Sequence, residues 1–336
     1  MKHMIQQYVQ ETHYRKCMHL PETVTERYEI LAQGEYNRNY LFTHPVTGQK
    51  LILRVNLGSQ MHLEHQIEYE YQALKILEDS GRTPKVYYVD GTKEKIPYGV
   101  MVMEFLPGHA MRYETELFRA ADILADIHSM PVKEGTHLIT QENPLRGILE
   151  ECEEMFAIYE QSESGDERKK RWIRELLQEG WKRVDELSSP SYRCCINTEL
   201  NSTNFLIQEQ EGRDYLIDWE KPLYGEPAQD LGHFLAPTTT FWKTDVILTE
   251  KQVEEFMQAY IESVNGRFPT EGIEERVKVY IPVTCLRGIT WCAMAWIQYQ
   301  DPEKEVFNES TYKKLEDYLS DEFLEKIEKF IKKQNI

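Results

Sequence analysis

Three residues with side chains suited to metal and phosphate chemistry lie close together in the sequence: Glu199, Asn204 and Asp218. Two carboxylates and one amide form an oxygen-rich set, which suits a hard cation such as Mg²⁺ that completes its shell with water and phosphate. Asp218 directly follows the apolar run 215–217, where an unpaired carboxylate is costly. Taken singly, Asp218 is more simply interpreted as the cap of a turn and Asn204 as the first residue of a strand. The occurrence of all three at this spacing favours a functional site over these structural roles.

The elements that must position these side chains form a short hairpin. Strands are predicted at 204–208 and 214–219, separated by a turn that contains a glycine. Antiparallel pairing around this turn places Asn204 opposite Asp218 at the open end of the hairpin. Glu199 lies in the loop that enters the same end, so the topology gathers the three side chains at one point.

A second pair of charged residues lies in segments that otherwise read as core. Arg54 lies in the apolar strand 49–55, and Glu70 lies on the apolar face of a helix predicted at 61–79. A buried cation and a buried anion each need a counter-ion. We therefore expect an ion pair that directs the guanidinium toward the sheet surface; a purely structural ion pair is the alternative.

The wider pattern predicts an α+β protein with two lobes. A five-stranded antiparallel sheet carrying one helix is expected from strands at 28–31, 39–43, 49–55, 85–90 and 99–105. After the break at Leu106-Pro107-Gly108 the periodicity is mainly helical, at 116–129, 144–161, 166–188 and about 250–333.

We accordingly predict three parts of the chain. Residues 1–27 are an N-terminal extension with one short helix, residues 28–105 a β-rich lobe, and residues 106–336 a helical lobe. The helical lobe includes a helical insertion at 140–190.

The order and spacing of the motifs resemble the aminoglycoside phosphotransferase family. Glu199 and Asn204 are separated by four residues, Ile217-Asp218 follows the hairpin, and the segment 225–231 (GEPAQDL) is similar to the family's Gly-Asp-Pro element. That family is similar to choline kinases and, more distantly, to protein kinases. The resemblance covers about 28 to 300 and implies a bilobal, protein-kinase-like fold and ATP- and Mg²⁺-dependent phosphate transfer.

The resemblance also implies that the helical lobe contains the catalytic loop and the substrate site, and it implies roles for the polar residues. Asn204 and Asp218 would bind the metal, and Glu199 would orient the attacking hydroxyl. Glu199 stands where the family has Asp, and Asn197 stands where it has His. The Glu keeps the carboxylate but places it one methylene further out, and phosphoryl transfer depends more on positioning than on early proton removal. We therefore expect retained activity.

The resemblance assigns the nucleotide to the first lobe. Arg54 matches the lysine that orients phosphate, and Glu70 matches its helix partner. The loop 34–39 lies where the family covers the phosphates, which makes Gly34, Asn37 and Asn39 candidates for phosphate binding. A plain hairpin loop is the alternative.

The segment 100–108 resembles a kinase lobe-connecting segment. The Glu104 carbonyl and the Leu106 N–H are expected to pair with adenine, and Met103 is expected to lie behind the ring. Such a position between two lobes is where small-molecule sites commonly form.

Other notable residues have simpler interpretations. His128 is expected to be a core histidine, and Asp230 a brace for the catalytic loop. Aromatic residues at 291, 296 and 299 fit a buried helix better than a box for a quaternary ammonium group. The acidic run 150–154 is expected to be a solvated helix face.

Composition limits the classes of protein that remain. The chain has 336 residues and a formal net charge of −18, which argues against general binding to nucleic acid or anionic membrane and is compatible with a cationic substrate. The longest apolar stretch, 289–297, is too short for a membrane span. Six cysteines without a Cys-x-x-Cys pair predict neither a disulfide scaffold nor structural zinc, and we expect a cytoplasmic location.

The sequence thus predicts a kinase that transfers the γ-phosphate of ATP to a hydroxyl of a small molecule. Amino alcohols such as choline or ethanolamine, amino sugars, aminoglycosides and sugars are the candidate acceptors. The competing hypothesis is a catalytically impaired nucleotide-binding pseudokinase that acts as a sensor or partner module, motivated by Asn197 and Glu199. A protein kinase is the weaker third option, because no activation segment is recognisable between Asp218 and Asp230.

Overall fold

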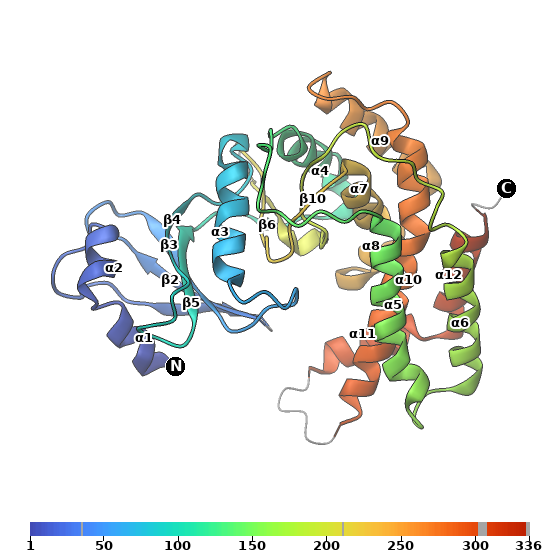
Figure 1. The fold of residues 1–336 in the computed structure, drawn as a ribbon, viewed down its shortest axis with the longest axis horizontal. Coiled ribbons are helices and arrows are strands. Elements are labelled where there is room, and N and C mark those ends of the chain that lie inside the picture. The colour runs from blue at the N-terminus through green and yellow to red at the C-terminus, as the bar shows by residue number, and fades with distance from the viewer. Residues whose placement is uncertain (35, 210–211, 302–307, 334–336) are drawn as a thin grey trace.

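The computed structural model describes the whole chain except residues 35, 210–211, 302–307 and 334–336. It contains a β-rich part and a larger helical part, which lie side by side in Figure 1. The β-rich part is a five-stranded antiparallel sheet in the order β1-β2-β3-β5-β4. Its strands are β1 (Glu29–Gln33), β2 (Asn37–Thr43), β3 (Lys50–Asn56), β4 (Val86–Asp90) and β5 (Gly99–Glu104).

The two faces of this sheet are covered by different elements. Leu51, Leu53 and Val55 alternate along β3 and pack with the N-terminal helices α1 (Lys2–Tyr8) and α2 (Thr12–Cys17). Arg54 has the opposite parity, so it projects from the face that carries α3 (Gln66–Leu77). Figure 1 shows α1 and α2 on one side of the sheet and α3 on the other, between the sheet and the helical part.

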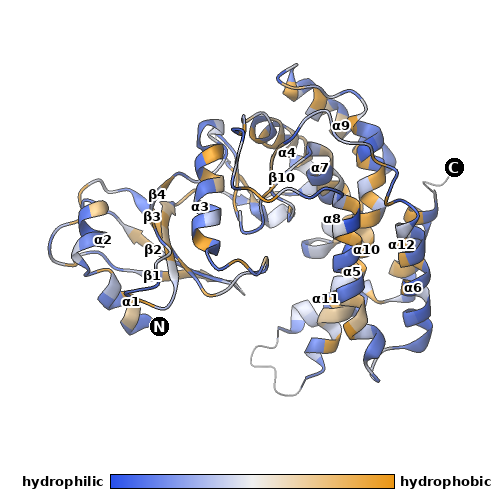
Figure 2. Cartoon of the chain, viewed as in Figure 1, coloured by the Kyte–Doolittle hydropathy of each residue, from blue (hydrophilic) through white to orange (hydrophobic). Residues whose placement is uncertain are grey.

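The helical part is built around the long helix α10 (Ile273–Tyr299), which packs against α5, α6, α7, α8, α11 and α12. Figure 2 shows apolar residues along α10 and a largely hydrophilic α6 at the outside. The remaining helices are α4 (Tyr113–His128), α5 (Pro144–Gln161), α6 (Glu167–Trp181), α7 (Pro227–Leu235), α8 (Pro237–Lys243), α9 (Glu250–Val264), α11 (Glu309–Tyr318) and α12 (Asp321–Lys333), with short 3₁₀ turns η1 (Glu78–Ser80) and η2 (Ser202–Asn204). Among the described residues, no helix has the length and apolar character needed to cross a membrane.

The predicted five-stranded sheet with one helix is present, and the long predicted helices are found. The N-terminal segment, however, forms two helices instead of one. The sequence reading also missed the small sheet of β7 (Cys194–Ile196) and β10 (Leu223–Gly225), and it missed α7 and α8. These are short elements, whose formation depends on tertiary packing more than on local pattern. The proposed domain limits stay predictions.

The register predicted for the hairpin was wrong by one residue. β8 (Phe205–Ile207) and β9 (Tyr215–Leu216) pair with Phe205 opposite Leu216, so Asn204 lies opposite Ile217 and not opposite Asp218. Asn204 ends η2 instead of starting a strand. The carboxylate of Asp214 accepts a hydrogen bond from the Gln208 N–H at 3.0 Å, which ends the ladder with a side chain. Residues 210–211 of the predicted turn lie outside the described part.

Candidate active site

The loop after β7 carries Glu199 and is held by a buried carboxylate. Asp230, at the start of α7, is fully buried and accepts hydrogen bonds from the backbone N–H groups of Asn197 at 2.8 Å and Thr198 at 2.7 Å. Thr198 has a φ of 69°, which is strained for a β-branched residue. Asp230 therefore braces the loop, as predicted. Its other contact is His128, a fully buried core histidine 3.2 Å away, as also expected.

Asn197 links this loop to the segment that carries Asp218. Its Oδ1 accepts from the N–H of Glu199 at 3.1 Å, and its Nδ2 donates to the carbonyl of Asp218 at 2.8 Å. The side chain is almost fully buried, so both hydrogen bonds are shielded from water. An Asn at this position thus fixes the backbone of both functional segments.

The structure brings Glu199, Asn204 and Asp218 together despite the shifted register. The Nδ2 of Asn204 donates to the carbonyl of Glu199 at 3.1 Å, and the Ile217 N–H donates to the carbonyl of Asn204 at 2.9 Å. Asp218 has a φ of 67°, and its side chain is 43% exposed. A strained carboxylate at the end of a buried segment is consistent with a binding role.

Arg54 lies at the centre of a first charge cluster. It forms the predicted buried ion pair with Glu70. Its Nη2 also lies 3.2 Å from Asp218 Oδ1 and 3.3 Å from Glu220 Oε1, and its Nε donates to Asn39 Oδ1 at 3.2 Å. We call Arg54, Glu70, Asp218 and Glu220 the Arg54 cluster. In it, three carboxylates surround one guanidinium.

The excess of carboxylates in the Arg54 cluster affects their protonation. Burial and the nearby charge of Asp218 raise the pKa of Glu220 to about 8. Burial likewise raises the pKa of Glu70, whose Oε2 is buried without a hydrogen-bond partner. The cluster can therefore accept additional positive charge.

A magnesium ion fits this donor set. Mg²⁺ commonly takes one or two protein oxygens and completes its shell with water and phosphate. Asp218 and the amide oxygen of Asn204 meet that requirement. Within the described part of the chain, no three His, Cys, Asp or Glu side chains form a self-sufficient metal site.

Glu220 was missed by sequence reasoning, although it lies only two residues after Asp218. Its carboxylate accepts from Asn37 Nδ2 at 2.5 Å as well as from Arg54. Asn37, predicted to bind phosphate, is thus engaged by Glu220. The signal was the second carboxylate in the Asp-Trp-Glu run.

A cavity of about 320 Å³ contains most of the residues predicted to bind nucleotide. It lies against the segment that leaves β5, and the Arg54 cluster forms part of its wall. Its lining includes Asn39, Arg54, Glu70, Met103, Glu104, Leu106, Asn204 and Asp218. Gly34 lines a second cavity instead, and Glu35 of the same loop lies outside the described residues.

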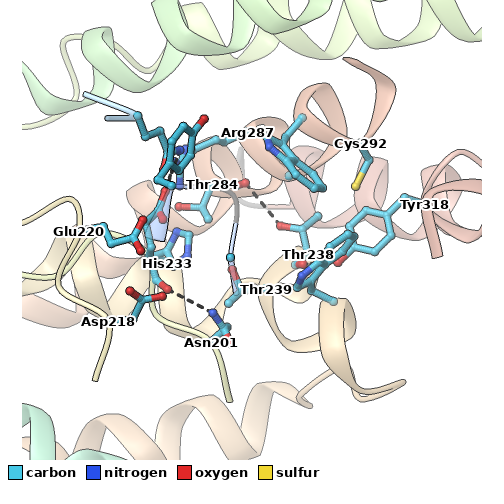
Figure 3. A pocket seen from close by; sticks show the side chains of 17 residues that line it. Asn201, Asp218, Glu220, His233, Thr238, Thr239, Thr284, Arg287, Cys292 and Tyr318 are labelled. Carbon is cyan, nitrogen blue, oxygen red and sulfur yellow. Dashed lines mark hydrogen bonds and ion pairs between the residues drawn. The ribbon is translucent and has the colours of Figure 1, made fainter. Parts of the chain in front are cut away.

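The second cavity, of about 370 Å³, shares Asp218 with the first. Residues near the sheet contribute Gly34, Tyr36 and Gln60, whereas α8, α10 and α11 supply the opposite wall. Figure 3 shows Asp218 and Glu220 on one side of this cavity and Thr238, Tyr318 and Cys292 on the other. Because Glu199 also lines it, a molecule bound here would lie between that carboxylate and the Arg54 cluster.

Arg287, on α10, forms a second charge cluster around Glu199. Its Nη2 lies 3.1 Å from Glu199 Oε1, and its Nε lies 2.9 Å from Glu151 Oε2. Lys221 Nζ lies 3.0 Å from Glu151 Oε1. We call Arg287, Glu151, Glu199 and Lys221 the Arg287 cluster. It holds two cations and two carboxylates, so its charges balance.

The Arg287 cluster corrects one sequence expectation. Glu151 belongs to the run 150–154 that was expected to be a solvated face, yet it contacts two cations. Burial alone would raise its pKa, but Arg287 and Lys221 together lower the pKa of Glu151 to about 2. Its neighbours Glu150, Glu153 and Glu154 are exposed, as expected. Arg287 interrupts the apolar second half of α10, a signal of the same kind as Arg54 that sequence reasoning overlooked.

The aromatic residues of α10 form two groups: some pack against neighbouring helices, and one lines the second cavity. Trp296 packs against Tyr159 and Tyr299 against Tyr312, which agrees with the buried-helix interpretation. Trp291, in contrast, lines the second cavity beside Trp242 of α8, with ring centroids 5.0 Å apart and an interplanar angle of 86°. His233 of α7 lines the same cavity and was not recognised from the sequence.

Comparison with known proteins confirms the family resemblance and the fold class. Residues 27–272 match the model of the phosphotransferase enzyme family. A comparison with curated protein sequences finds no match.

Among solved structures, the chain is similar to a choline kinase from Cryptosporidium parvum Iowa II (12% identity, TM-score 0.67, 95% of each chain covered). It is also similar to an ethanolamine kinase from Plasmodium vivax (15% identity, TM-score 0.61, 94% of this chain and 86% of that chain). A third similar structure is a spectinomycin phosphotransferase in complex with ADP and spectinomycin (13% identity, TM-score 0.60, 93% of this chain and 94% of that chain). At these identities the likeness shows the fold alone.

Proposed function

The chain belongs to the phosphotransferase enzyme family, and we propose that it transfers the γ-phosphate of ATP to a hydroxyl group of a small molecule. The observation that carries this proposal is the pair of adjoining cavities with Asp218 in both linings. One cavity contains the residues expected to bind nucleotide, and the other contains Glu199. A phosphate at the junction would lie beside both.

Arg54 and the segment after β5 would bind the nucleotide. Arg54 is held by Glu70 and Asn39, so its position is fixed before ATP arrives. Met103, Glu104 and Leu106 line the far end of the same cavity, where the adenine would lie. A similar structure, the spectinomycin phosphotransferase, was solved with ADP.

Asn204 and Asp218 would hold Mg²⁺, which neutralises charge on the phosphates when bound. The Arg54 cluster supports this assignment, because three carboxylates around one guanidinium leave negative charge to be compensated. The raised pKa values of Glu70 and Glu220 agree with that excess.

Glu199 would orient the acceptor hydroxyl and accept its proton. Both of its side-chain hydrogen bonds, from Gln60 at 3.1 Å and Arg287 at 3.1 Å, use Oε1. The other oxygen, Oε2, is the one assigned to the acceptor hydroxyl. Two contacts on Oε1 restrict the longer Glu side chain, which compensates for its extra methylene relative to Asp.

Amino alcohols, amino sugars and aminoglycosides form the first acceptor panel, in line with the choline, ethanolamine and spectinomycin named for similar structures. The cytoplasmic location stays a prediction from the sequence.

The test is transfer of label from γ-labelled ATP to a panel of hydroxyl compounds, with and without Mg²⁺. We expect a phosphorylated product with the native enzyme and a loss of roughly 10²-fold or more in kcat with Glu199→Gln. Glu322→Gln, at an exposed position on α12, is the matched control and should retain activity.

The second candidate function is the nucleotide-binding pseudokinase. The observation in its favour is that Glu199 already forms an ion pair with Arg287. Tight binding of ATP without transfer to any acceptor would establish this alternative and overturn the proposed kinase.

A further inference from the structure

We call the second cavity, which would bind the acceptor, the acceptor cavity. Its wall formed by α8, α10 and α11 carries aromatic and hydroxyl side chains, and we call it the aromatic wall. Trp242, Trp291 and Tyr318 supply three ring systems, and Thr238 and Thr239 supply hydroxyl groups. Trp242 contacts both other rings, with centroid distances of 5.0 Å to Trp291 and 5.8 Å to Tyr318. Figure 3 shows Thr238, Thr239 and Tyr318 together on this side. This wall offers apolar ring surface and neutral hydrogen-bonding groups.

The carboxylates of the cavity come from the loops after β7 and β9, and not from the helices that supply the aromatic wall. Of the described residues that line the cavity, only Glu199, Asp218 and Glu220 are acidic. Asp218 and Glu220 belong to the Arg54 cluster, which faces the phosphate and metal. Glu199 belongs to the Arg287 cluster, whose two carboxylates are matched by two cations. The aromatic wall therefore has no carboxylate to bind an ammonium group.

The donors of Arg287 are also engaged. Its Nε and Nη2 contact Glu151, Nη2 also contacts Glu199, and Nη1 donates to the Thr198 carbonyl at 3.5 Å. Four of its five N–H groups are therefore used, and its charge is shared by two carboxylates, which weakens its attraction for a carboxylate or phosphate on the acceptor. The cavity is thus not arranged to bind an anionic acceptor at this end.

The pKa of His233 indicates how its surroundings in the cavity act on a positive charge. Burial, together with the positive charges of Arg287 and Lys221, lowers the pKa of His233 to about 3, although a hydrogen bond to the backbone of Leu200 opposes the shift. The imidazole is therefore neutral at pH 7. The same surroundings that disfavour an imidazolium would disfavour an ammonium group placed beside it.

A box for a quaternary ammonium group is the obvious alternative for two perpendicular tryptophans. Here, however, the ammonium of Lys243 lies 5.3 Å from the ring centroid of Trp242. A second cation near that ring would be repelled by the first, and no carboxylate on this wall would offset the repulsion.

We propose that the acceptor is an uncharged, ring-shaped molecule with several hydroxyl groups, such as a sugar or cyclic polyol. Its ring would stack on Trp291 or Trp242, and neutral His233 and the threonines would bind its hydroxyls while one hydroxyl faces Glu199. The inference rests on the proposed kinase function and narrows its acceptor. It departs from the cationic acceptors that the overall acidity allowed.

The test compares matched acceptors that differ only in charge. Glucose, glucosamine and glucuronate form one set, and galactose, galactosamine and galacturonate a second. These sets are embedded in a wider library of neutral, ammonium-bearing and carboxylate-bearing hydroxyl compounds, assayed with the native enzyme, ATP and Mg²⁺. We expect the best acceptor to be neutral, with kcat/KM at least about tenfold above its charged counterparts, or about 1.4 kcal/mol.

The outcomes distinguish the two proposals. A best acceptor that carries an ammonium or carboxylate group overturns this inference and leaves the kinase function standing. If no compound of any class is phosphorylated although ATP binds, the kinase function fails and the inference fails with it.

A variant tests the charge argument directly. Thr239→Asp supplies a carboxylate on the aromatic wall and should shift the glucosamine-to-glucose ratio of kcat/KM by about tenfold or more toward the amine. Thr239→Asn is the uncharged control and should leave that ratio unchanged. An unchanged ratio in a Thr239→Asp protein with native Tm would contradict the proposal. The native-enzyme comparison decides the matter if that variant does not fold.

Discussion

The Arg54 cluster and the Arg287 cluster both contribute residues to the lining of the acceptor cavity, and each is centred on one arginine. In the first, three carboxylates surround the guanidinium, and the pKa values of Glu70 and Glu220 are raised. In the second, Lys221 supplies a further cation, and the pKa of Glu151 is lowered to about 2. Similar residue types thus produce opposite electrostatic conditions.

This difference separates two tasks. An excess of negative charge destabilises the free protein locally but favours a divalent cation, so the Arg54 cluster suits binding of metal and phosphate. A balanced cluster has no such need. It holds Glu199 in place and adds no net charge to the acceptor cavity.

The largest expected effect comes from removing a carboxylate of the Arg54 cluster. Asp218→Asn keeps the shape but removes the charge that would hold Mg²⁺, so we expect phosphate transfer to fall roughly 10²–10³-fold. The midpoint of the Mg²⁺ dependence should also rise. The measurement is kcat as a function of Mg²⁺ concentration at saturating ATP.

The control for this prediction is Asp321→Asn, an exposed carboxylate on α12 that pairs with Arg168. It should leave both kcat and the Mg²⁺ midpoint unchanged. If Asp218→Asn lowered activity no more than Asp321→Asn, the Arg54 cluster would not be the metal site.

The next effect should appear in folding stability at the Arg287 cluster. Arg287→Met leaves Glu199 and Glu151 with less compensation at half-buried positions, which we expect to lower the free energy of unfolding by about 1–2 kcal/mol. Urea unfolding at pH 7 measures this loss. Arg168→Met, at an exposed ion pair, is the control and should leave stability nearly unchanged. Equal effects of the two substitutions would show that the balanced cluster contributes nothing special.

The same two clusters show what the sequence revealed in advance. Arg54 and Glu70 were predictable because each interrupts a clear apolar pattern, one on a strand and one on a helix. Glu199, Asn204 and Asp218 were predictable from their spacing along one loop and hairpin. The three residues lie close together although the predicted register was wrong. The side chains of Asn204 and Asn197 donate hydrogen bonds to the backbone carbonyls of Glu199 and Asp218 and so hold the two segments together.

Apart from Glu199, the members of the Arg287 cluster were missed by sequence reasoning, because the cluster is assembled by tertiary contacts. Its members come from α5, α10 and two loops, and α10 packs against α5 only in the folded chain. Glu151 is one of several acidic residues in a row, and local pattern does not distinguish the one that faces Arg287. Trp242 and His233 were missed for the same reason, since the short helices α7 and α8 were not predicted.

The smallest effect tests whether the two clusters respond to pH in opposite directions. Glu151 has a lowered pKa in the folded protein, so its contribution to stability is complete above its unfolded pKa of about 4.5. That contribution is lost as the pH falls toward about 2. Because the side chain is 31% exposed, we expect Glu151→Gln to cost only about 1 kcal/mol at pH 7 and almost nothing near pH 2.

Glu70 and Glu220 have raised pKa values, so acid relieves repulsion in the Arg54 cluster instead of breaking it. The free energies of unfolding of the native protein and of Glu151→Gln are measured between pH 2 and pH 7. Because the substitution alters only the Arg287 cluster, the difference between the two curves gives the contribution of Glu151 without that of the Arg54 cluster. The difference between the curves should shrink steadily as the pH falls below about 4.5. A difference that stayed constant with pH would mean that Glu151 stabilises the fold by packing, and that the Arg287 cluster is not held together by its charges.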